Sequence, residues 1–205
     1  MDIRSRLEEG AQQLALALTE SQYDLLLMYL GMIQKWNKAY NLVGTSNAIE
    51  LVQKHLLDSI SIIPYVKMSP LLDVGSGAGL PGIPLAICLP DISFTVLDSS
   101  GKKTRFMRQV VMDLKLTNVE IVQTRLENYY PREAPKTVLS RAFAPVGKAL
   151  QMLSVVCAPQ GQIQIMLGTQ PNELPSVVDV NNIQIHSITI PGLDSQRHLL
   201  IAERV

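Results

Sequence analysis

Apolar residues recur at helical spacing among polar ones through the first 63 residues of the chain. In the first helix that this pattern predicts, the repeating positions are Leu7, Ala11, Leu14 and Leu18. The next predicted helix opens with a capping-box pattern, Thr19 to Gln22, and keeps one apolar face made of Tyr23, Leu26, Leu27, Leu30, Ile33 and Tyr40. A further helix is predicted over residues 48–60, so we expect residues 1–63 to form an N-terminal helical extension.

From residue 64 to residue 205 the pattern alternates between short apolar runs and amphipathic stretches. The apolar runs predict strands over residues 71–74, 93–98, 119–122, 136–142, 162–167, 182–190 and 198–205. Helices are predicted between them, from Pro81, over 101–116 and over 145–157. Such alternation indicates parallel βαβ units with an antiparallel ending. We therefore predict an α/β fold whose Rossmann-like sheet carries helices on both faces and forms one compact unit with the N-terminal extension.

Composition and charge narrow the class of protein. The chain is 47% hydrophobic and 18% charged, and its 18 Lys and Arg residues balance 18 Asp and Glu residues. A neutral chain of this kind binds nucleic acid only through a local basic patch. Cys88 and Cys157 lie far apart in apolar runs, so we expect buried thiols. The polar N-terminus does not resemble a secretory signal, and no apolar run approaches the roughly 18 residues of a membrane span, so we expect a cytoplasmic protein. We also expect a monomer.

The stretch "LLDVGSGAGLPGIPLAI", residues 71–87, places Gly75, Gly77 and Gly79 between a predicted strand and a predicted helix. Each glycine costs backbone entropy on folding, so three of them in one turn indicate that a ligand approaches the backbone closely. In open parallel sheets, ligands bind beyond the carboxyl ends of the strands. Asp98 ends the next strand, at the place where an acid commonly binds ribose hydroxyls. The pattern therefore predicts a ligand of the nucleoside type.

The spacing of the glycines favours one such ligand. The dinucleotide fingerprint G-x-G-x-x-G requires a glycine where this chain has Leu80. With Asp73 before the first glycine, the run reads D-x-G-x-G-x-G and resembles the first motif of class I methyltransferases, which bind S-adenosylmethionine. That cofactor has no pyrophosphate to place on the helix N-terminus. A nucleotide-binding oxidoreductase stays open as an alternative, as does a non-enzymatic binding module, which would need a basic face but not the glycine turn.

Longer strings resemble one family within that class. They are "KWNKAYNLVG", "KHLLDSI", "LLDVGSGAGLPGIPLAI", "VLDSSGKKTRFMRQV", "LSRAFAPV" and "DSQRHLLI". From about Trp36 to Arg204 they resemble the bacterial small-subunit ribosomal RNA methyltransferase G family, once called glucose-inhibited division protein B. The resemblance implies methylation of N7 of one guanine in a conserved loop of 16S ribosomal RNA, with the 30S subunit or a precursor as the expected partner. Methylation of another RNA site is the alternative.

The resemblance also implies the residues that bind the cofactor. They are Gly75 and Leu80 in the glycine turn, Leu126 and Glu127 after the third strand, Arg141 after the fourth, and Asp98 in its ribose role. An arginine at this position binds either the cofactor's carboxylate or an RNA phosphate through its bidentate fork. Asp73 is expected to fix the turn. We predict no metal site. We also predict no catalytic base, because guanine N7 carries an in-plane lone pair and no proton.

The residues predicted to bind RNA lie on the helix over 101–116. Lys102, Arg105 and Arg108 gather opposite an apolar face made of Phe106, Met107, Val110, Val111 and Leu114. An ordinary solvated helix face is the alternative interpretation. Loops beyond the predicted strand ends carry aromatic residues suited to base stacking, namely Tyr129, Tyr130 and Phe143.

Three positions have no firm prediction. His55 and Asp58 in "KHLLDSI" lie on an apolar helix, where a histidine is as readily a core residue as a functional one. Leu167 in "IMLG" stands where the family typically carries a lysine. Whatever that lysine contributes to substrate or cofactor binding is left open for this chain.

Overall fold

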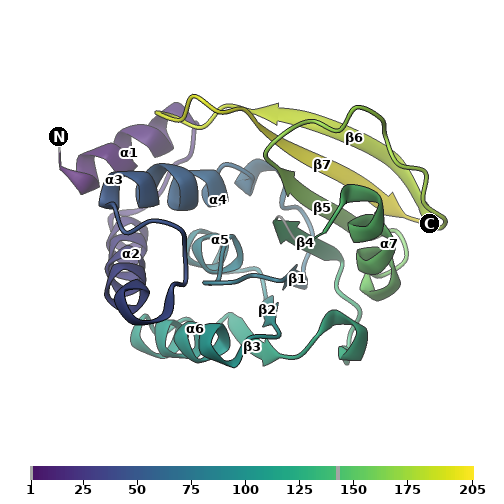
Figure 1. The fold of residues 1–205 in the computed structure, drawn as a ribbon, viewed down its shortest axis with the longest axis horizontal. Coiled ribbons are helices and arrows are strands. Elements are labelled where there is room, and N and C mark those ends of the chain that lie inside the picture. The colour runs from purple at the N-terminus through teal and green to yellow at the C-terminus, as the bar shows by residue number, and fades with distance from the viewer. Residues whose placement is uncertain (1, 142–143) are drawn as a thin grey trace.

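A seven-stranded mixed sheet forms the centre of the molecule (Figure 1). The computed structural model describes residues 2–141 and 144–205. In spatial order the strands are β3-β2-β1-β4-β5-β7-β6, and β1 to β5 pair in parallel while β7 pairs antiparallel with β5 and β6. Their bounds are Leu71–Val74 (β1), Phe94–Asp98 (β2), Val119–Gln123 (β3), Thr137–Arg141 (β4), Gln162–Leu167 (β5), Val180–Ile188 (β6) and Arg197–Arg204 (β7). The predicted α/β sheet with an antiparallel ending is confirmed.

The two faces of the sheet bury separate sets of side chains, because successive residues of a strand point to opposite faces. In β1, Leu71 packs in one cluster with α5 (Gly82–Cys88) and α6 (Gly101–Asp113). Its neighbour Leu72 packs in the other, with α7 (Val146–Val156). Helices therefore cover both faces, as the alternating pattern predicted.

The N-terminal helices extend the first of these clusters. Helix α1 (Ile3–Gln13) precedes the long helix α2 (Glu20–Tyr40), whose capping box between Thr19 and Gln22 forms as predicted. The prediction of a first helix reaching Leu18 is wrong, because the chain turns at Ala15, whose φ is 55°. Buried residues of both parts of the chain share one core, so the extension packs directly on the sheet and its helices. A domain boundary near residue 63 stays a prediction.

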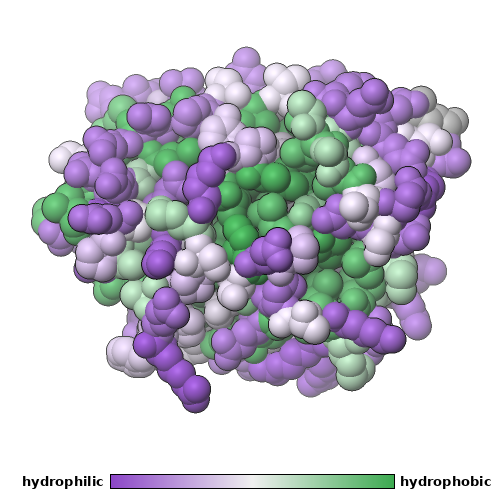
Figure 2. Space-filling model, turned by 180° about the vertical axis from the view of Figure 1, so that it is seen from behind, coloured by the Kyte–Doolittle hydropathy of each residue, from purple (hydrophilic) through white to green (hydrophobic). Residues whose placement is uncertain are grey.

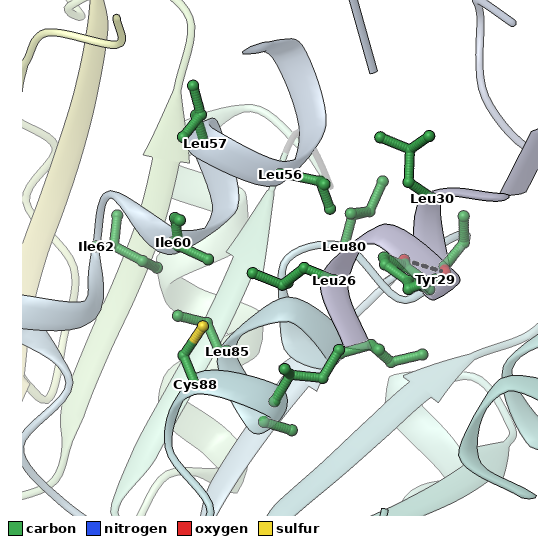
Figure 3. Close-up of a cluster of buried hydrophobic side chains, with 14 of the residues drawn as sticks. Leu26, Tyr29, Leu30, Leu56, Leu57, Ile60, Ile62, Leu80, Leu85 and Cys88 are labelled. Carbon is green, nitrogen blue, oxygen red and sulfur yellow. Dashed lines mark hydrogen bonds between the residues drawn. The ribbon is translucent and has the colours of Figure 1, made fainter. Parts of the chain in front are cut away.

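The third predicted helix is present but irregular. It begins as α3 (Ala48–Leu51), widens into a π-helical turn, η1 (Val52–Leu57), and ends as α4 (Asp58–Ile60); a short 3-10 turn, η2 (Ile63–Tyr65), follows. Wide turns of this kind often occur at functional sites. Leu56 and Ile60 point from this segment into the core toward Leu26 and Leu85, whereas Leu57 points away from them (Figure 3) and packs against Gly10 of α1.

The surface carries apolar residues in places. Seen from behind the view of Figure 1, hydrophobic residues gather near the middle of the face, and hydrophilic residues surround them (Figure 2). Within residues 2–141 and 144–205, no helix has the length and apolar character that crossing a membrane requires. Both cysteines are buried, and burial raises the pKa of Cys88 to about 12, so this thiol stays protonated.

Candidate active site

The glycine turn after β1 adopts a conformation that needs glycine. Gly75, Gly77 and Gly79 have φ angles of 69°, 65° and 92°, in the left-handed region that residues with a side chain rarely adopt. A Cβ on Gly77 would meet only the Lys103 Nζ, at 3.8 Å, so the space above this residue is open. The turn therefore presents bare backbone to any ligand lying beyond the end of β1.

Asp73, the third residue of β1, fixes the turn from below. Its fully buried carboxylate accepts hydrogen bonds from the backbone N–H of Gly82, at 2.8 Å, and from the hydroxyl of Ser76. A Cβ on Gly82 would lie 2.6 Å from Asp73 Oδ2, so this contact requires glycine. Burial raises the pKa of Asp73 to about 6. Its contacts match the expectation that Asp73 holds the turn.

Asp98 connects the ends of β1 and β2. Its Oδ2 accepts a hydrogen bond from the Gly77 N–H at 2.9 Å, and its Oδ1 accepts one from the Ser100 N–H at 2.8 Å. The Lys103 Nζ lies 3.9 Å from Oδ2. Each carboxylate oxygen has a second lone pair, so Asp98 can hold the turn and still accept hydrogen bonds from ligand hydroxyls.

A cleft of about 380 Å³ opens beside Asp98. It brings together four of the predicted cofactor-binding residues, Gly75, Asp98, Leu126 and Glu127, with Ser99, Ser100, Lys103, Thr124 and Arg125 also in its lining. The fifth, Leu80, is only 2% exposed, and its side chain points into the core near Leu26 and Tyr29 (Figure 3). The exposed backbone of the turn, the acid and the volume fit an adenosine-type cofactor.

Arg141, the sixth predicted residue, lies in a neighbouring cavity of about 440 Å³. Its Nη1 donates to Oδ2 of Asp58 at 3.1 Å, and the Nε of Arg197 donates to Oδ1 of the same carboxylate at 3.2 Å. Asp58 is 3% exposed and thus lies buried between two guanidinium groups. The two arginines outnumber this carboxylate, so the cavity, which Lys54 also lines, suits an anionic or electron-rich ligand.

Two histidines line this arginine cavity with ring nitrogens that bind nothing among the described residues. These atoms are the buried Nδ1 of His55 and the buried Nδ1 of His198. Burial, and next the charge of Arg141, lower the pKa of His55 to about 4, so its imidazole is neutral at physiological pH. Leu167 lines the same cavity, so the position of the family's lysine lies here.

Helix α6 has the predicted two-sided character. Phe106, Met107 and Val110 are buried, whereas Lys102, Arg105 and Arg108 are exposed. Arg105 and Arg108 line a shallow cavity of about 400 Å³, together with Gly101, Gln109, Met112 and Gln123. Gly101 directly follows Ser100, and Gln123 directly precedes Thr124. Both of these neighbours line the cleft beside Asp98, so the basic surface adjoins that cleft.

The candidate stacking residues lie on another side of the cleft. Tyr129 and Tyr130 line a mainly apolar cavity of about 490 Å³ between the loop after η3 (Leu126–Asn128) and helix α7. Tyr130 is 85% exposed. Phe143 lies outside the described residues.

Sequence reasoning missed several residues that contribute to the site. Lys103 lies at the cofactor cleft, although only its neighbours were assigned to a basic face. Arg197 and His198 belong to the string "DSQRHLLI", which supported the family resemblance but received no role. Tyr29 follows Leu26 at helical spacing and is fully buried beneath the glycine turn. For Tyr29, this helical spacing is the one signal that the sequence offers.

Comparison with solved structures places the fold in a known class. The chain superposes on magnesium protoporphyrin IX methyltransferase of Synechocystis PCC 6803, solved with bound SAM, with a TM-score of 0.60 and 12% identity over 86% of this chain and 97% of the other. An rRNA methylase from Streptococcus thermophilus gives a TM-score of 0.52 at 17% identity over 72% and 94%. The fold is that of the class I methyltransferases.

Sequence comparison is more specific. The family model for rRNA small subunit methyltransferase G matches residues 22–200. The ribosomal RNA small subunit methyltransferase G of Marinobacter nauticus is 43% identical over 203 residues, which is 97% of this chain and 94% of the relative. The protein of that name from Pseudomonas syringae pv. tomato is 42% identical over 206 residues, 97% and 95% of the two chains. The chain belongs to the rRNA small subunit methyltransferase G family.

Proposed function

We propose that this protein transfers a methyl group from S-adenosylmethionine to N7 of a guanine in 16S ribosomal RNA. The observation that carries the proposal is the glycine turn of a class I methyltransferase, with its three left-handed glycines tied to Asp98, in a chain of the rRNA small subunit methyltransferase G family. The cleft beside that turn has the size and the acid that the cofactor requires.

We assign the cofactor to the cleft lined by Gly75, Asp98, Leu126 and Glu127. Asp98 accepts from the ribose hydroxyls, and Leu126 and Glu127 contact the adenine end. Leu80 acts from the core, where it supports the turn instead of touching the ligand through its side chain. When bound, the cofactor supplies an electrophilic methyl group on a sulfonium.

We place the target guanine in the arginine cavity, next to the end of β4. Arg141 and Arg197 are held there by Asp58, and two buried Nδ1 atoms, of His55 and His198, lack partners among the described residues. Buried polar atoms nearly always have a partner, so these two nitrogens await hydrogen bonds from a ligand or from water. We assign Arg141, which lines this cavity, a contact with either the cofactor's carboxylate or an RNA phosphate.

Alignment carries the proposed chemistry. Guanine N7 attacks through a lone pair in the plane of the base and has no proton to lose, so the step needs no general base. His55 is neutral because its pKa lies near 4, and Asp58 is occupied by two arginines. These groups hold the base and exclude water, and positioning then supplies most of the reduction in the barrier.

We further propose that Lys102, Arg105 and Arg108 contact phosphates of the RNA. Their exposed face adjoins the cofactor cleft, although the chain as a whole has no net charge. Affinity for naked RNA is then weak, and we infer that the protein acts as a monomer in the cytoplasm on RNA folded within the 30S subunit or a precursor of it.

Methyl transfer to purified 16S RNA and to 30S particles tests the proposal. Labelled methyl groups should enter one guanine, and mapping should place them at N7. Binding of S-adenosylmethionine is measured against NAD in parallel. Labelling of a different base or atom contradicts the specificity, and preferential binding of NAD contradicts the assignment to methyl transfer.

A further inference from the structure

We infer that Tyr29, from helix α2 of the N-terminal extension, is a positioning residue for the cofactor. Its hydroxyl donates a hydrogen bond of 2.7 Å to the backbone carbonyl of Ala78, which lies between Gly77 and Gly79 in the glycine turn. The inference rests on the proposed function, because it assigns the turn to the cofactor. It gives the N-terminal helices a part in binding that the glycine motif alone does not require.

The setting of Tyr29 makes this hydrogen bond specific. The side chain is fully buried and lies beside Leu26, Leu30 and Leu80 (Figure 3). Its ring stacks on Phe106 of α6, with 6.4 Å between ring centroids and an interplanar angle of 30°. Burial raises the pKa of Tyr29 far above its ordinary value, so the hydroxyl stays protonated and donates. Packing therefore fixes the position of the ring, and with it the position of the donating hydroxyl.

The Ala78 carbonyl depends on this donor. Ala78 is 2% exposed, so little water reaches it, and a buried carbonyl without a partner is costly. Without the hydroxyl, rotation of the carbonyl toward solvent lowers the free energy of the turn. This rotation moves the neighbouring Gly77 and Gly79. Gly77 in turn donates its N–H to Asp98, the proposed ribose ligand. Loss of the Tyr29 hydroxyl therefore lowers the fraction of protein whose turn can bind.

The test is Tyr29→Phe, which keeps the ring and removes only the hydroxyl. We expect the Kd for S-adenosylhomocysteine and the KM for S-adenosylmethionine to rise about 10-fold, the worth of one hydrogen bond to a buried group. At saturating cofactor, kcat and the KM for RNA should stay within about twofold. Tyr23→Phe is the matched control, since Tyr23 lies on the same face of α2 and no hydrogen bond of the described residues joins it to the turn.

A purely structural role predicts a different result. In that case Tyr29→Phe lowers the melting temperature and leaves the Kd within about twofold of the unsubstituted protein, which would overturn the inference. Failure of the unsubstituted protein to bind S-adenosylhomocysteine at all would refute the proposed function first, and the two failures are therefore distinguishable.

A second measurement uses the unsubstituted protein and does not depend on the variant folding. Coupling between two sites is reciprocal, so cofactor binding must also stabilise the contact of α2 with the turn. We expect S-adenosylhomocysteine to slow amide hydrogen exchange at residues 26–33 of α2 as well as at residues 75–80. Protection of the turn with no change in α2 would overturn the inference.

Discussion

The cofactor cleft and the arginine cavity lie side by side and are built in opposite ways. The cleft is formed by the ends of three adjacent strands, β1 to β3, and its acid Asp98 is held by the backbone N–H groups of Gly77 and Ser100. The arginine cavity joins residues from η1, α4, β4, β5 and β7, and its acid, Asp58, is held by side chains. In the function proposed above, the first recognises its ligand mainly through the shape of the backbone, and the second through charge.

This difference determines which substitutions each site can tolerate. A backbone site fails when a side chain enters it, because a left-handed glycine cannot be replaced without strain. A charge site fails when its ion pairs are broken, because a buried charge is then left without a partner. Substitutions in the two sites should therefore affect binding of the cofactor and binding of the RNA separately.

The largest expected effect belongs to the backbone site. Gly75→Val places a β-branched side chain at a φ of 69° and in the cleft. We expect cofactor affinity to fall by more than about 100-fold, measured by titration calorimetry. Gly44→Ala is the control, because a Cβ on Gly44 meets no atom within 4 Å. A folded Gly75→Val protein with undiminished affinity would refute the assignment of the cleft.

The carboxylate beneath the turn gives the next effect, in stability. The pKa of Asp73 is raised by burial from 3.8 to about 6, so the folded state prefers the protonated carboxyl. Stability from this preference is fully present below about pH 4 and lost as the pH rises through 6. Relative to Asp73→Asn, which does not titrate, the unfolding free energy should fall by about 3 kcal/mol across this window.

Urea denaturation between pH 3.5 and 8 measures that difference. We expect the gap between the two proteins to change below about pH 6.5 and to be constant above it. A gap that does not vary with pH would show that Asp73 titrates normally in the folded protein.

The charge site should respond to Asp58→Asn, which keeps the size of the side chain and removes its charge. Arg141 and Arg197 then lose their common partner and their fixed orientation. We expect single-turnover methyl transfer to slow by about 10- to 50-fold, since breaking a buried pair is strongly unfavourable, while the Kd of the cofactor stays within about twofold.

A matched control for Asp58→Asn is Asp24→Asn, on α2 and not among the residues that line the arginine cavity. Asp24 pairs with Arg4 at 2.6 Å, but Asp24 is exposed, and exposed pairs contribute little. We expect no measurable change in rate. If Asp58→Asn instead weakens cofactor binding as strongly as it slows transfer, the two cavities form one site and do not act separately.

The lining residues of the proposed cofactor cleft were predicted from the sequence better than those of the arginine cavity. The reason is that the residues of the cleft lie at or just after the ends of successive strands. Asp98 ends β2, Gly75 and Glu127 come after β1 and β3, and the carboxyl ends of parallel strands must meet at one edge of a sheet. The pairing of Asp58 with Arg197 spans 139 positions in the chain, and no periodicity indicates it. Arg141 was predicted through family resemblance, but its partner was not.

The fold was predicted nearly completely, and its exceptions have physical causes. Every predicted strand is present, because alternating and continuous apolar runs fix which face each residue buries. The π-helical turn η1 was not predicted, since it depends on packing against the core and has no spacing of its own. Tyr29 was missed because its hydroxyl acts across 49 positions, on a carbonyl that no pattern of side chains reveals.

A smaller effect is expected from the basic face of α6, which adjoins the cofactor cleft. A log–log plot of affinity for naked RNA against salt should have a slope of about −2 to −4, at about 0.7 per phosphate contact. Replacing Lys102, Arg105 and Arg108 by alanine should flatten this slope by about 2, whereas Lys67→Ala should not change it. An unchanged slope in the triple variant would show that α6 is an ordinary solvated helix face.

The smallest expected effect is that of pH on the rate of methyl transfer. Because N7 carries no proton, the chemical step needs no base, and a rate limit set by proton transfer is not expected. His55 and Asp73 titrate below neutral pH, at about 4 and about 6, whereas burial raises the pKa of Tyr29 so that its hydroxyl stays protonated. Single-turnover rates at saturating RNA and cofactor should therefore be nearly flat between about pH 7 and 9, where both groups keep one protonation state.

His55→Ala extends this last test, because it removes a ring of the arginine cavity whose pKa is lowered by burial and by the charge of Arg141. We expect the variant to bind RNA a few-fold more weakly, through loss of one buried contact, and to keep the flat profile. Binding and rate are measured separately, by titration and by single turnover. A variant that binds RNA and cofactor normally but transfers no methyl group would show that proton transfer at His55 matters. Guanine N7 would then be the wrong acceptor, since only an acceptor that carries a proton needs such a base.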